Sequence, residues 1–236
     1  MPTTVQINKA WQLPPSTGYF QDVISKKQVV LHHTVGGTAK STFNYWVNQA
    51  NHVATAYLVD RDGTIYEVFE PKFWAWHLGL KLAQNSIANK QSIGIEIASA
   101  GPLRSGKELN ARLGHDKFDV NYLYAFDIDV APFEHAKRYY DMNVDQAKFV
   151  GVPTPFRGYS FFDAYTELQV ASVILLVNYL CEQFNIPKQL IPNQNKLEFD
   201  ISTLNFSGII THCNVRQDKS DLSPSFDWNR LYQSFI

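Results

Sequence analysis

Two histidine-bearing segments and one carboxylate have the types and the placement that a metal site needs. His212 follows the apolar residues 206–211, which read as a strand, and Asp221 returns in the polar turn after it. His32 and His33 end another apolar segment, VVLHHT. Imidazole nitrogens and carboxylate oxygens are common ligands of zinc. The pattern therefore predicts that His212, Asp221 and one histidine of the pair bind one ion.

The residues alone leave the choice of ligands open. Neighbours in a strand face opposite sides, so one of His32 and His33 faces a groove and the other faces the core or a helix. For this pair taken alone, two structural histidines are the favoured explanation. Cys213 is a rival ligand, but in a continued strand it takes the face opposite His212. Both could not serve one ion without breaking the strand.

Four further residues are candidates for chemistry or substrate contact. In SIGIEI, the isoleucines alternate with Gly94 and Glu96, so Glu96 points away from the isoleucine face. Lys219 lies two positions before Asp221, and FWAWHLG contains Trp76 and His77. Each has an ordinary explanation as well, namely a solvent-facing carboxylate, a solvated turn lysine and packing aromatics.

Strands and helices alternate through most of the chain, which predicts a mixed β-sheet flanked by helices in one α/β domain over residues 1–236. Thr166 and Gln169 form a capping-box pattern. Asp62-Gly63 is typical of a hairpin turn. We expect strands at 29–31, 92–97 and 206–211, a hairpin within 52–70, and helices at 41–49, 167–184 and 226–235.

Residues 100–165 break this periodicity and read as one folded insertion. Aromatic residues are dense, and strand-like pieces at 120–128 and 149–152 are separated by proline and glycine. The separating residues are Pro132, Pro153, Pro155 and Gly158.

Composition narrows the class of protein. The chain has 236 residues, 45% of them apolar and 18% charged, which suits one globular core. The formal net charge of −1 gives no global field toward nucleic acid or anionic membranes. Two cysteines are too few for a disulfide framework. We expect no signal peptide, no membrane span, no nucleic-acid or membrane partner, and a monomer.

The order of these segments resembles the zinc-dependent N-acetylmuramoyl-L-alanine amidases, the family shared by phage amidases, bacterial recycling amidases and peptidoglycan recognition proteins. The matching pieces, over about 27–232 without the insertion, are VVLHHT, YLVDRDGTIYEV, AWHLG, SIGIEI, YTELQ and THCNVRQDKSDLSPSFDW. The resemblance implies the peptidoglycan recognition protein fold and hydrolysis of the bond between N-acetylmuramic acid and L-alanine in peptidoglycan or muropeptides.

The resemblance also implies a role for each candidate. One zinc would be held by His32, rather than His33, together with His212 and Asp221. The family's acidic strand residue corresponds to Glu96, which would move the proton of the attacking water. Lys219 would stabilise the oxyanion. The sites proposed for substrate contact are Trp76 and His77.

Two departures from the family are visible. A tyrosine that some members carry before the DRDG strand is replaced near Thr55, which favours Glu96 as the base. The insertion at 100–165 has no counterpart, which leaves substrate contacts open. A peptidoglycan-binding module without activity and a zinc peptidase that cuts within the stem peptide are the alternatives. The setting is either a cytoplasmic recycling enzyme or a phage lysin.

Overall fold

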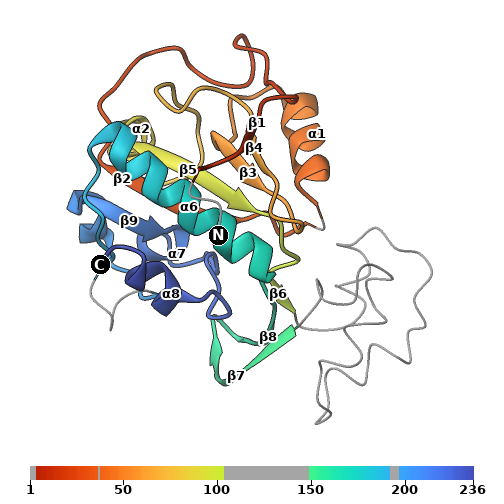
Figure 1. Ribbon diagram of the computed structural model, residues 1–236. Coiled ribbons are helices and arrows are strands. Elements are labelled where there is room, and N and C mark those ends of the chain that lie inside the picture. Colours follow the sequence, from red (N-terminus) through yellow and green to blue (C-terminus); the bar gives the residue numbers. More distant parts are fainter. Residues whose placement is uncertain (1–3, 37, 104–148, 192–196) are drawn as a thin grey trace.

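One six-stranded sheet forms the centre of the protein (Figure 1). The computed structural model describes residues 4–36, 38–103, 149–191 and 197–236. The strands follow the order β1-β4-β3-β5-β2-β9, and only the β3–β4 pair is antiparallel. Their bounds are β1 Ile7–Asn8, β2 Gln28–His33, β3 Tyr57–Val59, β4 Ile65–Glu67, β5 Ser92–Ile97 and β9 Gly208–Thr211. The predicted mixed sheet is confirmed.

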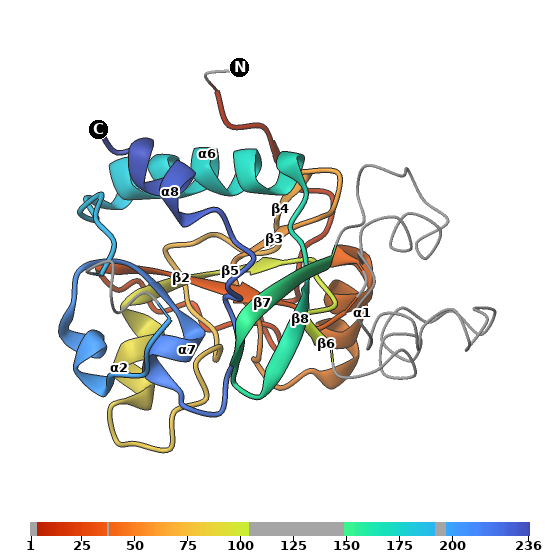
Figure 2. The ribbon, with the colours of Figure 1, turned by 90° about the horizontal axis from the view of Figure 1, so that it is seen from below.

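Helices cover both faces of this sheet (Figure 2). α6 and α8 lie on one face, and α2 and α7 lie on the other. The helices are α1 Ala39–Gln49, α2 Asn85–Lys90, α6 Glu167–Phe184, α7 His212–Val215 and α8 Trp228–Gln233, with a short 3-10 helix, η4, at Ile201–Asn205. Within the described residues, no helix has the length and apolar character needed to cross a bilayer.

Alternation along the central strands produces two cores. Val29 and Leu31 of β2, with the three isoleucines of β5, pack with the buried side of α6 in the larger core. Val30 of β2 packs on the other face with Ile210 of β9 and Val215 of α7. His32 therefore belongs to the α7 face and His33 to the α6 face. This period of two decides which way every side chain at the strand ends points.

The predicted hairpin and the long helix are confirmed. Gly63 has φ +81° in the turn between β3 and β4, a conformation that favours glycine. α6 has the predicted bounds, and its N-cap is a full capping box between Thr166 and Gln169. Two helices differ from their predicted bounds: α1 begins at Ala39 after the Thr38 cap, and α8 covers only Trp228–Gln233.

The region predicted as an insertion contributes a second, three-stranded sheet in the order β6-β8-β7. β6 covers Pro102–Leu103, β7 covers Phe149–Phe156 and β8 covers Tyr159–Asp163. The predicted piece 120–128 and Pro132 lie outside the described residues.

One prediction about this region is wrong. Pro153 and Pro155 do not end a strand, because β7 runs through both. β7 is an edge strand whose pairing with β8 shifts register between Gly151 and Phe156, and prolines are tolerated at edges and bulges.

The two chain segments that connect the second sheet to the main sheet are held by buried contacts. Asp163 is fully buried, pairs with Arg61 beside the β3–β4 hairpin, and accepts a hydrogen bond from the backbone N–H of Ala100 at 2.6 Å. Both ends of the region therefore meet at one buried carboxylate.

The cap of α6 gives a stability prediction. Thr166 Oγ1 accepts from the N–H of Gln169 at 3.0 Å and donates to the carbonyl of Arg61 at 2.7 Å. Thr166→Ala removes both bonds from a buried site and should lower the free energy of unfolding by about 1–2 kcal/mol, measured by urea denaturation. Thr38→Ala, at the exposed cap of α1, is the matched control and should cost less. Equal losses in the two variants would contradict this account.

Candidate metal centre and active site

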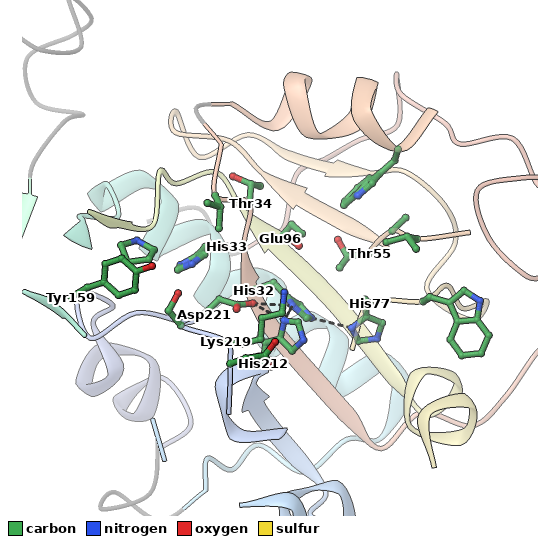
Figure 3. A pocket seen from close by; sticks show the side chains of 18 residues that line it. His32, His33, Thr34, Thr55, His77, Glu96, Tyr159, His212, Lys219 and Asp221 are labelled. Carbon is green, nitrogen blue, oxygen red and sulfur yellow. Dashed lines mark hydrogen bonds and ion pairs between the residues drawn. The ribbon is translucent and has the colours of Figure 1, made fainter. Parts of the chain in front are cut away.

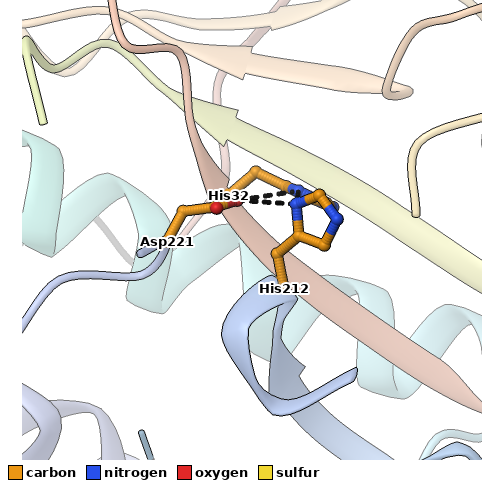
Figure 4. Close-up of side chains that lie close together, drawn as sticks. All are labelled: His32, His212 and Asp221. Carbon is orange, nitrogen blue, oxygen red and sulfur yellow. Dashed lines mark hydrogen bonds and ion pairs between the residues drawn. The ribbon is translucent and has the colours of Figure 1, made fainter. Parts of the chain in front are cut away.

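Three side-chain atoms converge at the carboxyl-terminal edge of the sheet (Figure 4). Nδ1 of His32 lies 3.1 Å from Nδ1 of His212 and 3.1 Å from Oδ2 of Asp221. The third side of this triangle, from His212 Nδ1 to Asp221 Oδ2, is 2.9 Å. Four ligands placed tetrahedrally at about 2.0 Å from zinc lie about 3.3 Å apart. The triangle therefore has nearly the size of one face of a zinc site.

Strand register and one backbone bond hold these residues together. Leu31 of β2 pairs with Thr211 of β9, so the next residues, His32 in β2 and His212 at the start of α7, lie side by side. The chain then turns back, and the N–H of Cys213 donates to the carbonyl of Asp221 at 2.6 Å. That bond closes the loop beneath the carboxylate.

The donor set is in the state that metal binding needs. His212 Nε2 lies 2.8 Å from the carbonyl of Leu78, which can only accept, so Nε2 carries the proton and Nδ1 offers a lone pair. Burial and the neighbouring His212 lower the pKa of His32 to about 4, which keeps His32 neutral at pH 7. Burial alone would raise the pKa of Asp221, but His212 and His32 outweigh it and hold that pKa well below its usual range. Two imidazoles and one carboxylate form a usual donor set for zinc.

The two rival ligands point elsewhere. Nδ1 of His33 lies 3.1 Å from the hydroxyl of Tyr165, on the α6 face. Sγ of Cys213 lies 3.0 Å from Oγ1 of Thr211 and 3.6 Å from the carbonyl of Leu197. Strand alternation does not explain the direction of Cys213, as the sequence had suggested. The strand has already ended at this point, because His212 begins the helical turn α7.

The three residues line a pocket of about 380 Å³ (Figure 3). All the other predicted site residues line it too, namely Glu96, Lys219, Trp76 and His77. Lys219 comes from the same loop as Asp221. His77 Nδ1 lies 3.0 Å from His32 Nε2, and His77 Nε2 lies 2.9 Å from Oγ of Ser92. The structure thus brings together all seven residues predicted for the site.

Glu96 lies beside the triangle as a carboxyl group that readily takes a proton. It pairs with His32 across β2 and β5, and it points into the pocket while the isoleucines of β5 enter the core. Its Oε2 is buried, and among the described residues that atom has no hydrogen-bond partner. Burial, together with the charge of Asp221, raises the pKa of Glu96 well above its usual value, although Lys219 opposes the shift.

Gly94 is needed for the close approach of two pocket side chains. A Cβ at this position would lie 2.6 Å from Cγ2 of Thr55 and 3.2 Å from Nδ1 of His77. The glycine of SIGIEI therefore lets Thr55 and His77 lie directly on β5.

Sequence reasoning missed Tyr159, which lines the pocket from β8 together with Pro102 of β6. Arg157 and Gly158 both have positive φ in the two-residue turn before it, which is typical of a tight hairpin. Only the glycine of this turn was visible in the sequence. The docking of the second sheet against the pocket, which brings Tyr159 into it, was not.

Solved structures share this fold at low identity. A complex of the amidase AmiD from Escherichia coli superposes with a TM-score of 0.51 at 16% identity, over 92% of this chain and 60% of that one. A mutant endolysin from Bacillus subtilis superposes with a TM-score of 0.51 at 13% identity, over 99% of this chain and 100% of that one. The Staphylococcus aureus hydrolase AmiA superposes with a TM-score of 0.51 at 12% identity, over 98% of this chain and 82% of that one. No curated protein matches the chain.

A model of a protein family matches most of the chain. The model described as N-acetylmuramoyl-L-alanine amidase covers residues 23–224, including β2, β5, β9 and the loop that carries Asp221. The match thus includes the sheet edge where these side chains converge, and the chain belongs to the N-acetylmuramoyl-L-alanine amidase family.

Proposed function

We propose that this chain is a zinc-dependent amidase, one domain over residues 1–236, whose single zinc is held by His32, His212 and Asp221. The observation that carries the proposal is the triangle of Nδ1, Nδ1 and Oδ2 atoms with sides of 2.9–3.1 Å. Three unprotonated donor atoms this close repel one another, and a cation bound among them removes the repulsion. Zinc bound there supplies the Lewis acidity that activates water and polarises the scissile carbonyl.

Two residues of the pocket handle the proton and the charge. Glu96 accepts the proton of the attacking water and later delivers it to the departing amine of L-alanine, so the carbon–nitrogen bond breaks without a free amide anion. The lactyl carbonyl carbon keeps the water oxygen as a carboxylate. The ammonium of Lys219 stabilises the negative charge that forms on the carbonyl oxygen.

The substrate we propose is peptidoglycan or a muropeptide derived from it. The AmiD structure holds anhydro-N-acetylmuramic acid-L-Ala-D-γ-Glu-L-Lys, which supports this class of substrate for a chain of the same fold. Trp76 offers an indole face at the pocket. Both ring nitrogens of His77 are engaged within the chain, so a substrate contact there would use its ring carbons.

Two other functions are compatible with this geometry, a stem-peptide peptidase and a binding module without activity, and product analysis distinguishes them. An amidase releases a peptide with a free L-alanine amine and a glycan with an intact lactyl carboxylate, whereas a stem-peptide peptidase leaves alanine on the sugar. A binding module releases nothing. Comparing intact sacculi with soluble anhydro-muropeptides would also separate a wall-lytic role, as in a phage lysin, from cytoplasmic recycling.

Zinc content tests the ligand set. His212→Ala and His32→Ala should each lose stoichiometric zinc, because two remaining ligands hold the ion weakly. His33→Ala and Cys213→Ser should keep it, because their side chains face Tyr165 and Thr211. Metal analysis on folded protein, verified by circular dichroism, measures this. An empty His33→Ala site beside a filled His32→Ala site would reverse the choice of histidine.

Glu96→Gln tests the proton transfer. The amide keeps the size of the carboxylate but cannot take a proton, so the single-turnover rate should fall by about 10²–10⁴-fold with zinc content unchanged. Substrate affinity should change little, because the lost interaction acts in the transition state. A rate within about threefold of the parent would remove Glu96 from the mechanism. Loss of zinc as well would make Glu96 a ligand.

Tyr159 tests whether the second sheet selects substrate without taking part in the chemistry. Tyr159→Ala removes an aromatic ring whose contact with substrate should contribute about 1–2 kcal/mol of binding free energy. KM should therefore rise about 5–30-fold, and kcat should stay nearly unchanged. Tyr159→Phe should keep most of the affinity. Tyr232→Ala removes a half-exposed tyrosine of α8 outside the pocket and is the control. A fall in kcat rather than a rise in KM would place Tyr159 in the chemistry.

A further inference from the structure

His77 occupies an unusual place in the pocket, because it contacts a proposed zinc ligand instead of leaving its nitrogens open to substrate. His77 Nδ1 lies 3.0 Å from His32 Nε2, the nitrogen of His32 that faces away from the triangle. The two rings meet edge to face, with centroids 5.1 Å apart. Figure 3 shows this contact as a dashed line between the two side chains.

The direction of this hydrogen bond follows from its far end. Ser92 Oγ donates its only proton to the carbonyl of Ala88 at 2.7 Å. It must therefore accept from His77 Nε2, which lies 2.9 Å away. A neutral His77 that carries its proton on Nε2 has a bare Nδ1, and a bare Nδ1 can only accept the Nε2 proton of His32. The chain runs in one direction, from His32 through His77 and Ser92 to a backbone carbonyl.

His77 holds the Nε2 proton of His32 as the carbonyl of Leu78 holds the Nε2 proton of His212. With its proton held on Nε2, His32 has a lone pair on Nδ1, and that atom lies 3.1 Å from both His212 Nδ1 and Asp221 Oδ2. We infer that His77 is a positioning residue, which fixes the tautomer and ring orientation of His32 so that Nδ1 faces the metal. The inference rests on the proposed zinc site.

The surroundings of His77 make it rigid enough for this role. Its backbone N–H donates to Oδ1 of Asn89 at 2.7 Å, a bond that does not depend on the side chain. Gly94 leaves room for the ring directly above β5. Partners that hold a ligating histidine from behind typically raise metal affinity by about 10–100-fold.

Three substitutions at position 77 test the hydrogen bond by zinc affinity, measured on the full chain by competition with a chromophoric chelator. His77→Leu removes the acceptor and should weaken zinc binding about 10–100-fold. His77→Asn places an amide oxygen near the position of Nδ1 and should stay within about threefold of the parent. His77→Gln carries the same amide near the position of Nε2, beyond reach of His32, and should behave like His77→Leu. His52→Asn, which alters a histidine stacked on Phe20, is the control and should leave zinc affinity unchanged.

A second measurement observes the hydrogen bond itself, first in the unaltered protein. Proton–nitrogen NMR of the zinc-loaded chain should show a His32 Nε2–H that exchanges slowly with water, identified by its correlations within the His32 ring. Slow exchange lost in His77→Leu and kept in His77→Asn supports the inference. A rapidly exchanging His32 Nε2–H in the parent, or equal zinc affinities for parent and His77→Leu, overturns it while leaving the zinc proposal intact. A parent chain that binds no zinc overturns both.

Discussion

The parallel register of β2 with its two neighbours is the constraint on which the site depends. Pairing of His32 with Glu96 puts a proposed ligand and a proposed base side by side, and pairing of Leu31 with Thr211 brings His212 to the same edge. A slip of one residue in either pair would turn one of these side chains into the α6 core. The fully buried apolar residues of β2 prevent such a slip, so the hydrophobic core also sets the positions of the reactive atoms.

Much of this arrangement could be predicted from local patterns. The alternation in SIGIEI gave the orientation of Glu96, the Thr166–Gln169 pair gave the start of α6, and Asp62-Gly63 gave the hairpin. These signals work because each depends on neighbours within a few residues. The choice between His32 and His33 could not be made in this way, because it depends on which face of β2 meets Tyr165, a residue far along the chain.

Long-range contacts also explain what the sequence left undetermined around the second sheet. Strand-like pieces and turn residues were visible in the region 100–165, but nothing local shows that Tyr159 faces the pocket. Asp163 and Arg61 fix that geometry, since their buried ion pair ties the end of β8 to the hairpin of the main sheet. A buried pair of this kind resists displacement, because breaking it would leave a charge without a partner in an apolar setting. The second sheet is thereby held as a fixed wall of the pocket.

The bond from the N–H of Cys213 to the carbonyl of Asp221 has a thermodynamic consequence of its own. It closes the segment from Cys213 to Asp221 into a hydrogen-bonded ring. The chain entropy of closing that ring is lost when the protein folds, together with the rest of the backbone order. Binding of the proposed zinc would then have little disorder left to remove, so its free energy would appear almost entirely as affinity. A rigid ring of this kind would favour retention of the proposed ion over rapid exchange with the surroundings.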